Sequence, residues 1–116
     1  MVDHWLYYET SAEPDLVRRE VRALRPDPRG RVADLFERYG SGELLEVETV
    51  VLEGELQGLL TRRPGRRYAI LFAEVSRHPR RALALHVCWA PLGIIPPSAR
   101  ALAADRLRGW REAGAA

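Results

Sequence analysis

The sequence has no lysine, only one cysteine and no long uninterrupted apolar run. All 18 of its basic residues are therefore arginine. The planar guanidinium group suits phosphate binding, but a GC-rich coding bias explains this choice more simply, so arginine content alone does not indicate phosphate recognition. Without lysine, the groups that could transfer a proton are histidine, the carboxylates and tyrosine.

The single Cys88 cannot form an internal disulfide, which agrees with a reducing compartment. The apolar runs are shorter than the ~20 residues of a transmembrane helix. Residues 1–10 lack the basic start, apolar centre and cleavage site of a signal peptide. We therefore expect a cytoplasmic protein without a membrane partner.

The length of 116 residues fits a single domain, residues 1–116. A hydrophobic content of 47%, arranged in periodic stretches, argues against a disordered chain. The net charge of +2 is too small to indicate nucleic-acid binding by itself. The placement of the charges is therefore more informative than their sum.

Apolar spacing and turn residues divide the chain into strands and helices. Aromatic residues near the start favour a strand, while apolar residues three and four apart indicate helices that end at Pro26 and Gly40. Asp27 followed by Pro28 is typical of a helix N-terminus, and Ser98 is expected to cap the last helix. The expected elements are a strand at 5–8, helices at 14–25 and 27–40, strand-like structure at 44–60, strands at 68–75 and 82–89, and a helix at 99–110.

This order predicts an α+β fold in which two N-terminal helices and a C-terminal helix pack on a twisted, mainly antiparallel sheet. The strands at 68–75 and 82–89 should form an antiparallel hairpin through a turn at 77–81. Helices are expected to cover one face of the sheet. The other face, partly open, would be the place for a binding groove.

His86 is the strongest candidate for a catalytic residue. Strict alternation along residues 82–89 places the large apolar side chains, Val87 among them, on a core-facing side, and His86 between Ala84 and Cys88 on the other. An imidazole in a shallow groove could act as an acid or a base near neutral pH, and the alternative is a structural histidine hydrogen-bonded within the sheet. No further ligand motif accompanies His86 and Cys88, so we expect neither a metal nor another cofactor.

The stretch TRRPGRRY sets arginines on both sides of a Pro-Gly turn. Arg62, Arg63, Arg66 and Arg67 could guide RNA phosphates toward the sheet, or they could be the solvated tip of a hairpin. If Arg67 points to the same groove as His86, it is the residue we expect to stabilise the charge of the transition state.

Other arginines extend the candidate RNA-binding surface. Arg77, Arg80 and Arg81 form a second basic turn at the opposite end of the expected hairpin, where they would contact RNA or form a solvated loop. Arg100 and Arg106 lie on the last expected helix and could flank its apolar stripe, although Arg100 could also face the groove.

Exposed apolar or aromatic residues offer further contacts. Trp5, Trp89 and Trp110 could stack on bases, or they could pack in a core or an interface. The segment PLGIIPP, residues 91–97, is apolar for a loop and could dock a partner protein or a second copy of the chain.

Five phrases in a fixed order carry a resemblance to a known family. They are YYETSAEPDLVRREVRAL, DPRGRVADLFERYGSG, GRRYAILFA, LALHVCW and IPPSARALAADRLRGW. They resemble, in turn, the opening strand and first helix, the second helix and turn, the Gly-X-X-Tyr-Arg strand, the Leu-Leu-His-X-Phe strand and the closing helix of the RelE/HigB superfamily of bacterial toxins, particularly its phage-derived HigB-like branch. The resemblance covers nearly the whole chain.

The resemblance implies a RelE/ParE-like fold and the toxin role in a type II toxin-antitoxin system. Members of the family are ribosome-associated endoribonucleases that cut mRNA and are neutralised by an antitoxin, often one with a helix-turn-helix DNA-binding domain. The expected partners are therefore a cognate antitoxin, the ribosome and mRNA, with DNA contacted only through the antitoxin. We expect catalysis without metal or cofactor.

The sequence departs from the family at basic positions. Relatives usually have arginine where Ala69 stands, two lysines where Ala90 and Pro91 stand, and arginine near Leu60. Arginines at shifted positions could replace these groups. Otherwise the chain is a catalytically degenerate toxin fold that binds an antitoxin or another protein, or a ParE-like toxin that targets gyrase.

Overall fold

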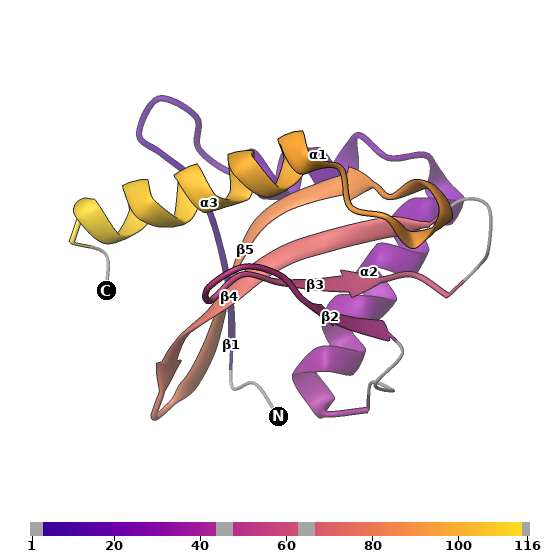
Figure 1. The fold of residues 1–116 in the computed structure, drawn as a ribbon, viewed down its shortest axis with the longest axis horizontal. Coiled ribbons are helices and arrows are strands. Elements are labelled where there is room, and N and C mark those ends of the chain that lie inside the picture. Colours follow the sequence, from indigo (N-terminus) through magenta and orange to yellow (C-terminus); the bar gives the residue numbers. More distant parts are fainter. Residues whose placement is uncertain (1–3, 44–47, 63–66, 115–116) are drawn as a thin grey trace.

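The computed structural model describes residues 4–43, 48–62 and 67–114 of the chain. They form three α-helices and a five-stranded sheet, which confirms the α+β class (Figure 1). The elements are, in chain order, β1 (His4–Tyr7), α1 (Leu16–Arg22), α2 (Pro26–Ser41), β2 (Thr49–Val51), β3 (Gln57–Leu60), β4 (Tyr68–Arg77), β5 (Arg80–Trp89), the short 3₁₀ turn η2 (Pro91–Gly93) and α3 (Pro97–Glu112).

The sheet is mixed, with the strand order β1-β5-β4-β3-β2. β1 runs parallel to β5, while the β5–β4, β4–β3 and β3–β2 pairs are antiparallel. The expected hairpin of β4 and β5 is confirmed, and each strand is two residues longer than the sequence pattern predicts. The expectation of a mainly antiparallel sheet is therefore confirmed, with β1 as the exception.

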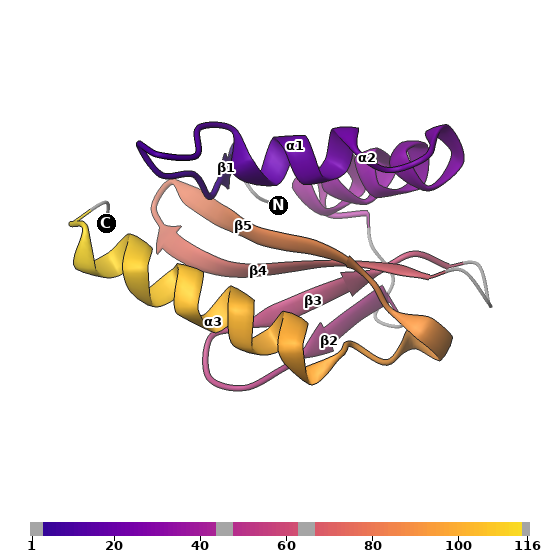
Figure 2. The same cartoon turned by 90° about the horizontal axis from the view of Figure 1, so that it is seen from above.

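Helices cover both faces of the sheet. α1 and α2 lie over one face and α3 lies over the other, so that the sheet is the middle layer (Figure 2). The expectation that helices cover one face and leave the other partly open is wrong. The reason is visible in β4, where residues 69–73 are all fully buried and apolar, as in a strand with both faces covered.

The face under α1 and α2 carries an aromatic core. Trp5 meets Phe36 edge to face with ring centres 4.8 Å apart, and its indole N–H donates to the Phe36 carbonyl at 2.9 Å. Phe72 of β4 packs against Trp5 and Tyr39. These contacts join β1, α2 and the centre of the sheet. Each aromatic ring buries a large apolar area, and the indole N–H of Trp5 still has a hydrogen-bond partner.

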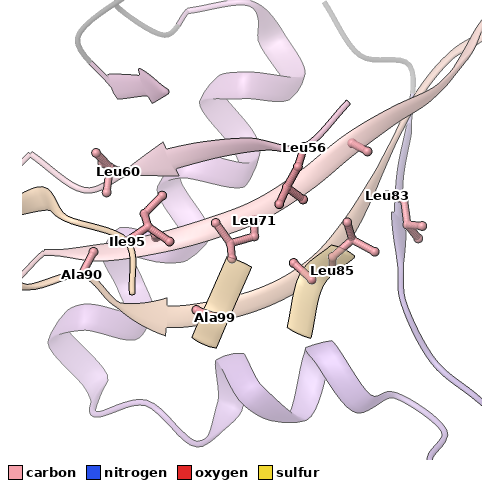
Figure 3. Packing of buried hydrophobic residues seen from close by; sticks show 11 residues of the cluster. Leu56, Leu60, Leu71, Leu83, Leu85, Ala90, Ile95 and Ala99 are labelled. Atoms are coloured by element: carbon pink, nitrogen blue, oxygen red, sulfur yellow. The ribbon is translucent and has the colours of Figure 1, made fainter. Parts of the chain in front are cut away.

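The face under α3 is aliphatic and built from smaller residues (Figure 3). Leu71 and Leu85 project from the sheet toward α3, which presents Ala99 and Ala103 to them. Because alanine carries only a methyl group, the helix backbone can lie close to the sheet. α3 is therefore packed too closely for an open groove to remain over the middle of this face.

A β-bulge interrupts the alternation of β5. Leu71 of β4 is opposite His86, and the next residue of β4, Phe72, is opposite Ala84, so Leu85 is an extra residue in β5. Val87 consequently joins the core under α1 and α2 rather than the side of Leu85. The predicted sorting of β5 into a core-facing side with Val87 and a groove side with His86 is wrong for this reason.

Prolines mark the helix starts more closely than the predicted caps do. α2 begins at Pro26, before Asp27, and it ends at Ser41, followed by Gly42, whose φ of 78° favours glycine. α3 begins at Pro97, so Ser98 lies inside the helix and makes no capping hydrogen bond. Within the described part of the chain, no helix is both long and apolar enough to cross a membrane.

The loop from Pro91 to Pro97 is only partly exposed. Ile95 is buried against Gly58 of β3, where an added Cβ would lie 2.8 Å from the Ile95 Cδ1. Leu92 and Ile94 point outward and are mostly exposed. Glycine at position 58 therefore lets the loop close over the sheet, while its two other apolar side chains remain on the surface.

Candidate functional site

β5 meets β1 along only the first half of its outer edge. The pairing ends at Tyr7 and Ala84, and one further hydrogen bond joins the Tyr8 N–H to the Ala84 carbonyl at 2.9 Å. No strand within the described residues pairs with the rest of this edge, residues 85–89. The backbone groups there need other partners, because unpaired polar groups are costly to bury.

Side chains from two helices supply these partners. Arg106 of α3 donates from Nη1 to the Leu85 carbonyl at 2.8 Å. The Val87 N–H donates to Glu20 Oε1 of α1 at 3.2 Å. Helices from opposite layers therefore meet at the outer edge of β5.

His86 lies between these two contacts. Its Nδ1 is 3.0 Å from Glu20 Oε1. Because an ionised carboxylate only accepts hydrogen bonds, Nδ1 carries the proton in the neutral ring, and Nε2 is left as the acceptor. A histidine oriented in this way can take a proton from a substrate through Nε2.

Arg106 completes the group that we call the Glu20–His86–Arg106 cluster. Its Nη1 is 3.0 Å from Glu20 Oε2 and 3.5 Å from His86 Nδ1. Its guanidinium carbon lies 5.5 Å from the centre of the Tyr8 ring, within the range of a cation–π contact. A carboxylate, an imidazole and a fixed cation are thus held together by α1, β5 and α3.

The cluster is largely enclosed but not sealed. The side chains of His86, Glu20 and Arg106 are 17%, 20% and 12% exposed. Electrostatic interactions are stronger at such a depth than at the open surface. Each of the three side chains therefore keeps some contact with solvent.

The neighbours of Glu20 keep it ionised. Burial by itself raises the pKa of this carboxyl group. Hydrogen bonds from His86 and from the Val87 N–H, with the electrostatic contribution of His86 and the positive charge of Arg106, outweigh the burial and hold the pKa below its ordinary value. Glu20 therefore remains an acceptor for the Nδ1 proton at neutral pH.

Cys88 lies two residues from His86 but is not an activated nucleophile. Burial, and then the negative charge of Glu20, raise the pKa of its thiol to about 11. Nucleophilic attack requires the thiolate, which is scarce at neutral pH when the pKa is this high. The chemistry of the cluster therefore depends on His86.

Arg67, the predicted partner of His86, has a different set of contacts. Its Nε donates to the Thr61 carbonyl at 2.8 Å. Its guanidinium group packs against Gly93, where an added Cβ would lie 2.7 Å from Nη1. The contacts described for Arg67 and for His86 share no residue, so the pair expected from the sequence is not assembled.

Arg62 belongs to a second ionic group, the Arg38–Glu48–Arg62 cluster. The Glu48 side chain is 1% exposed and accepts hydrogen bonds from Arg38 Nη2 at 3.0 Å and from Arg62 Nε. Arg62 itself remains mostly exposed. Arg63 and Arg66, the other predicted RNA contacts of this turn, lie outside the described residues.

The remaining predicted RNA contacts are spread over the molecule. Arg80 pairs with Glu74, and Arg77 is exposed near the tip of the β4–β5 hairpin. Arg81 and Arg100 are half-buried, at the start of β5 and in the first turn of α3. Arg67 and the turn at 77–81 lie at opposite ends of β4, as expected, and neither belongs to the Glu20–His86–Arg106 cluster.

Two members of the cluster were not expected from the sequence. Glu20 is 66 residues from His86 and looks like an ordinary charge on a short helix. Arg106 was expected to flank the apolar stripe of its helix. Its spacing from Ala99 and Ala103, seven and three residues, places it on the face that packs on the sheet, and this signal could have identified it.

Two of the positions that depart from the pattern of the resembled family lie in the core under α3. Ala69 and Ala90 are both fully buried there. An arginine or a lysine at either position would place a charge within an apolar cluster, which is costly without a partner. Neither position can carry a basic group in this packing. The cation for which a contact with His86 is described is Arg106.

No three His, Cys, Asp or Glu side chains gather into a possible metal site in residues 4–43, 48–62 and 67–114.

No protein-family model matches the chain, and no curated protein has a matching sequence. Its function is therefore inferred from its own residues.

Proposed function

We propose that the chain is the toxin of a type II toxin-antitoxin system and cuts mRNA at the ribosome without a metal ion. The observation that supports this most directly is His86, with Nδ1 held by Glu20 and with Arg106 beside it. The resemblance of five ordered phrases to the RelE/HigB superfamily supplies the substrate class. The fold is then a RelE/ParE-like variant in which α3 covers the second face of the sheet.

The cluster provides the groups that cleavage by a 2′-hydroxyl needs. His86 Nε2 takes the proton of the hydroxyl, and the 2′-oxygen forms a bond to phosphorus while the bond from phosphorus to the 5′-oxygen breaks. The departing 5′-oxygen takes a proton from water. Arg106 offsets the negative charge that develops on the phosphate oxygens, and Glu20 holds the imidazole and stabilises its protonated form.

A cognate antitoxin, of the helix-turn-helix type that the resemblance suggests, neutralises the enzyme and provides its only contact with DNA. Leu92 of η2 and Ile94 just after it are exposed and offer an apolar surface for the antitoxin. The ribosome presents the mRNA, and arginines such as Arg77 can contact phosphates there.

A second candidate function is a toxin fold that binds a protein without cutting RNA. The buried Ala69 and Ala90 favour it, because the positions that are usually basic in relatives cannot bind phosphate here. A ParE-like toxin acting on gyrase is a further form of this alternative. Both would leave His86 as a structural residue at the edge of β5.

Induced expression in a bacterial host tests the proposal. The native chain should arrest growth and leave transcripts cut at defined positions, whereas His86→Ala should reduce cleavage by about 10²- to 10⁴-fold, the usual contribution of a general base. Sequencing of transcript ends measures the cuts, and co-expression of a cognate antitoxin should restore growth.

The matched control is His78→Gln, which changes an exposed histidine in the hairpin turn. It should cut RNA as the native chain does. Circular dichroism and thermal unfolding establish that His86→Ala is folded. Equal cleavage by the native chain and by folded His86→Ala would refute the proposal, and intact transcripts with a harmless native chain would favour the binding role.

A further inference from the structure

A concave site lies at the other end of the β4–β5 pair from the hairpin turn. It is a groove of about 720 Å³, within the range of about 300–1,000 Å³ that is usual for ligand sites. Strands form one wall and the start of α2 forms the other. The lining residues are Arg25, Pro26, Asp27, Pro28, Arg31, Tyr68 and Trp89.

Two aromatic side chains form the strand wall of this groove. Tyr68 and Trp89 are directly opposite each other in β4 and β5, so their side chains project from the same face, with Cβ atoms about 4.5–5.5 Å apart. Trp89 is 56% exposed. Neither an aromatic ring nor a hydrogen-bond acceptor of the described residues engages it, so its face is open to a ligand.

The opposite wall is basic and rigid. Arg25 precedes α2, is exposed, and has no ion-pair partner among the described residues. Arg31 lies one turn into α2, and its Nη2 forms an ion pair with Oδ2 of Asp27. Pro26 and Pro28 fix the backbone between them. The three charged side chains of the groove therefore sum to one positive charge, carried by Arg25.

We infer that this groove binds a nucleotide of single-stranded RNA, with its base stacked on Trp89 and its phosphate at Arg25. Stacking is open to every base because each has a π face, and aromatic platforms beside cations are the common device of single-strand binding. A protein partner fits less well, because the walls combine a free guanidinium group with a flat aromatic pair. The groove would then hold RNA next to the bond that is cut.

The inference rests on the proposed function and assigns its substrate a second contact. Trp89 is three residues from His86 along β5, a separation of about 10 Å. Side chains alternate along this regularly paired stretch, so residues three apart point to different sides of the strand. An RNA strand that crosses the outer edge of β5 can therefore reach both sites.

Binding of a short single-stranded RNA, 2′-O-methylated at every sugar and labelled with a fluorophore, tests the inference without cleavage. Fluorescence anisotropy should show that Trp89→Ala weakens binding about 5- to 100-fold, while Trp89→Phe stays within about threefold of the native chain. Arg25→Gln should weaken binding and reduce the slope of log affinity against log salt by about 0.7.

Two control variants change similar residues elsewhere. Arg111→Gln removes a positive charge at the end of α3, and Val51→Ala shortens an exposed apolar side chain on β2. Both should bind as the native chain does. The inference is overturned if folded Trp89→Ala and Arg25→Gln bind RNA as tightly as the native chain does. It is also overturned if Trp89→Ala loses antitoxin binding while its RNA affinity is unchanged.

The two proposals can fail separately. RNA binding that depends on Trp89, in a chain that cuts no transcripts, keeps the groove and refutes the cleavage function. Cleavage that depends on His86, with RNA binding that does not change in Trp89→Ala or Arg25→Gln, keeps the cleavage function and refutes the groove.

Discussion

Glu20 and Glu48 are both carboxylates held by arginine, and they lie toward opposite edges of the same sheet. Glu48, just before β2, is almost completely buried between Arg38 and Arg62, and one of its oxygens has no partner among the described residues. Glu20, beside β5, uses both oxygens, and one of its partners is His86. Ionic clusters of similar composition therefore differ in whether they hold a group that can transfer a proton.

The difference separates a structural ion cluster from a candidate site. The Arg38–Glu48–Arg62 cluster joins α2 to the end of β3, and it contains no side chain of a type that ordinarily exchanges protons near neutral pH. The Glu20–His86–Arg106 cluster contains an imidazole, which does. A lowered glutamate pKa is common to both and does not by itself identify a functional site.

The largest expected difference between the clusters is in catalysis. Glu20→Gln should reduce RNA cleavage by about 10²- to 10⁴-fold, because the neutral amide no longer stabilises the imidazolium and can hold the wrong tautomer of His86. Glu48→Gln should leave cleavage per folded molecule within about threefold of the native rate. Single-turnover cleavage at several pH values measures both variants.

A change in the pH profile of Glu20→Gln distinguishes a positioning role from simple loss of fold. Similar cleavage losses in Glu20→Gln and Glu48→Gln would contradict the distinction drawn between the clusters.

The next largest effect is on stability, where Glu48→Gln should have a larger effect than Glu20→Gln, the opposite of their order in catalysis. Glu48→Gln should reduce the free energy of unfolding by about 2–3 kcal/mol, less than the 3–5 kcal/mol typical of a broken buried ion pair, because both arginines reach solvent. Glu20→Gln should cost about 1–2 kcal/mol, since the amide can keep one hydrogen bond at the more exposed site. Urea unfolding at neutral pH measures both.

Acid should remove the same contribution of Glu48. Burial raises the pKa of this carboxyl group, but hydrogen bonds from Arg38 and Arg62 and their charges outweigh the burial and lower it. Its contribution to stability is therefore present above the pKa of the unfolded chain and is lost as the pH falls through the lowered folded pKa. The native chain and Glu48→Gln should converge in stability in acid, and a constant gap would contradict the ionic origin.

The smallest expected effect is on the thiol beside the cluster. Cys88 should be alkylated slowly at neutral pH and faster as the pH approaches its pKa of about 11. Glu20→Gln should lower this pKa, because it removes the negative charge near the thiol, whereas Glu48→Gln should not change it. The rate of iodoacetamide labelling against pH measures the shift, and equal titration in the two variants would contradict it.

Local patterns predict most of the fold. The apolar spacing of α2 and α3 and the apolar runs of β4 and β5 identify these elements within a few residues, because each pattern arises within one segment. The cover of α3 over the second face was missed. The close packing of α3 depends on two small residues, Ala99 and Ala103. Their role can be recognised only when the sheet surface opposite them is known.

The candidate site was predicted only in part. His86 was identified because a lone histidine in an apolar strand is conspicuous. Glu20 comes from a helix 66 residues away, and no local pattern reports such a contact. Arg67 was chosen because it follows a basic turn, yet its position in the hairpin directs it to Thr61 instead.

One codon encodes the extra residue of β5, Leu85. Deletion of this one codon would remove the bulge and restore unbroken alternation, with His86 still opposite Leu71 and Trp89 still opposite Tyr68. It would also remove the Leu85 carbonyl group that accepts a hydrogen bond from Arg106. One codon thus supplies a contact that holds Arg106 at the edge of β5, while the pairing beyond it does not depend on that residue.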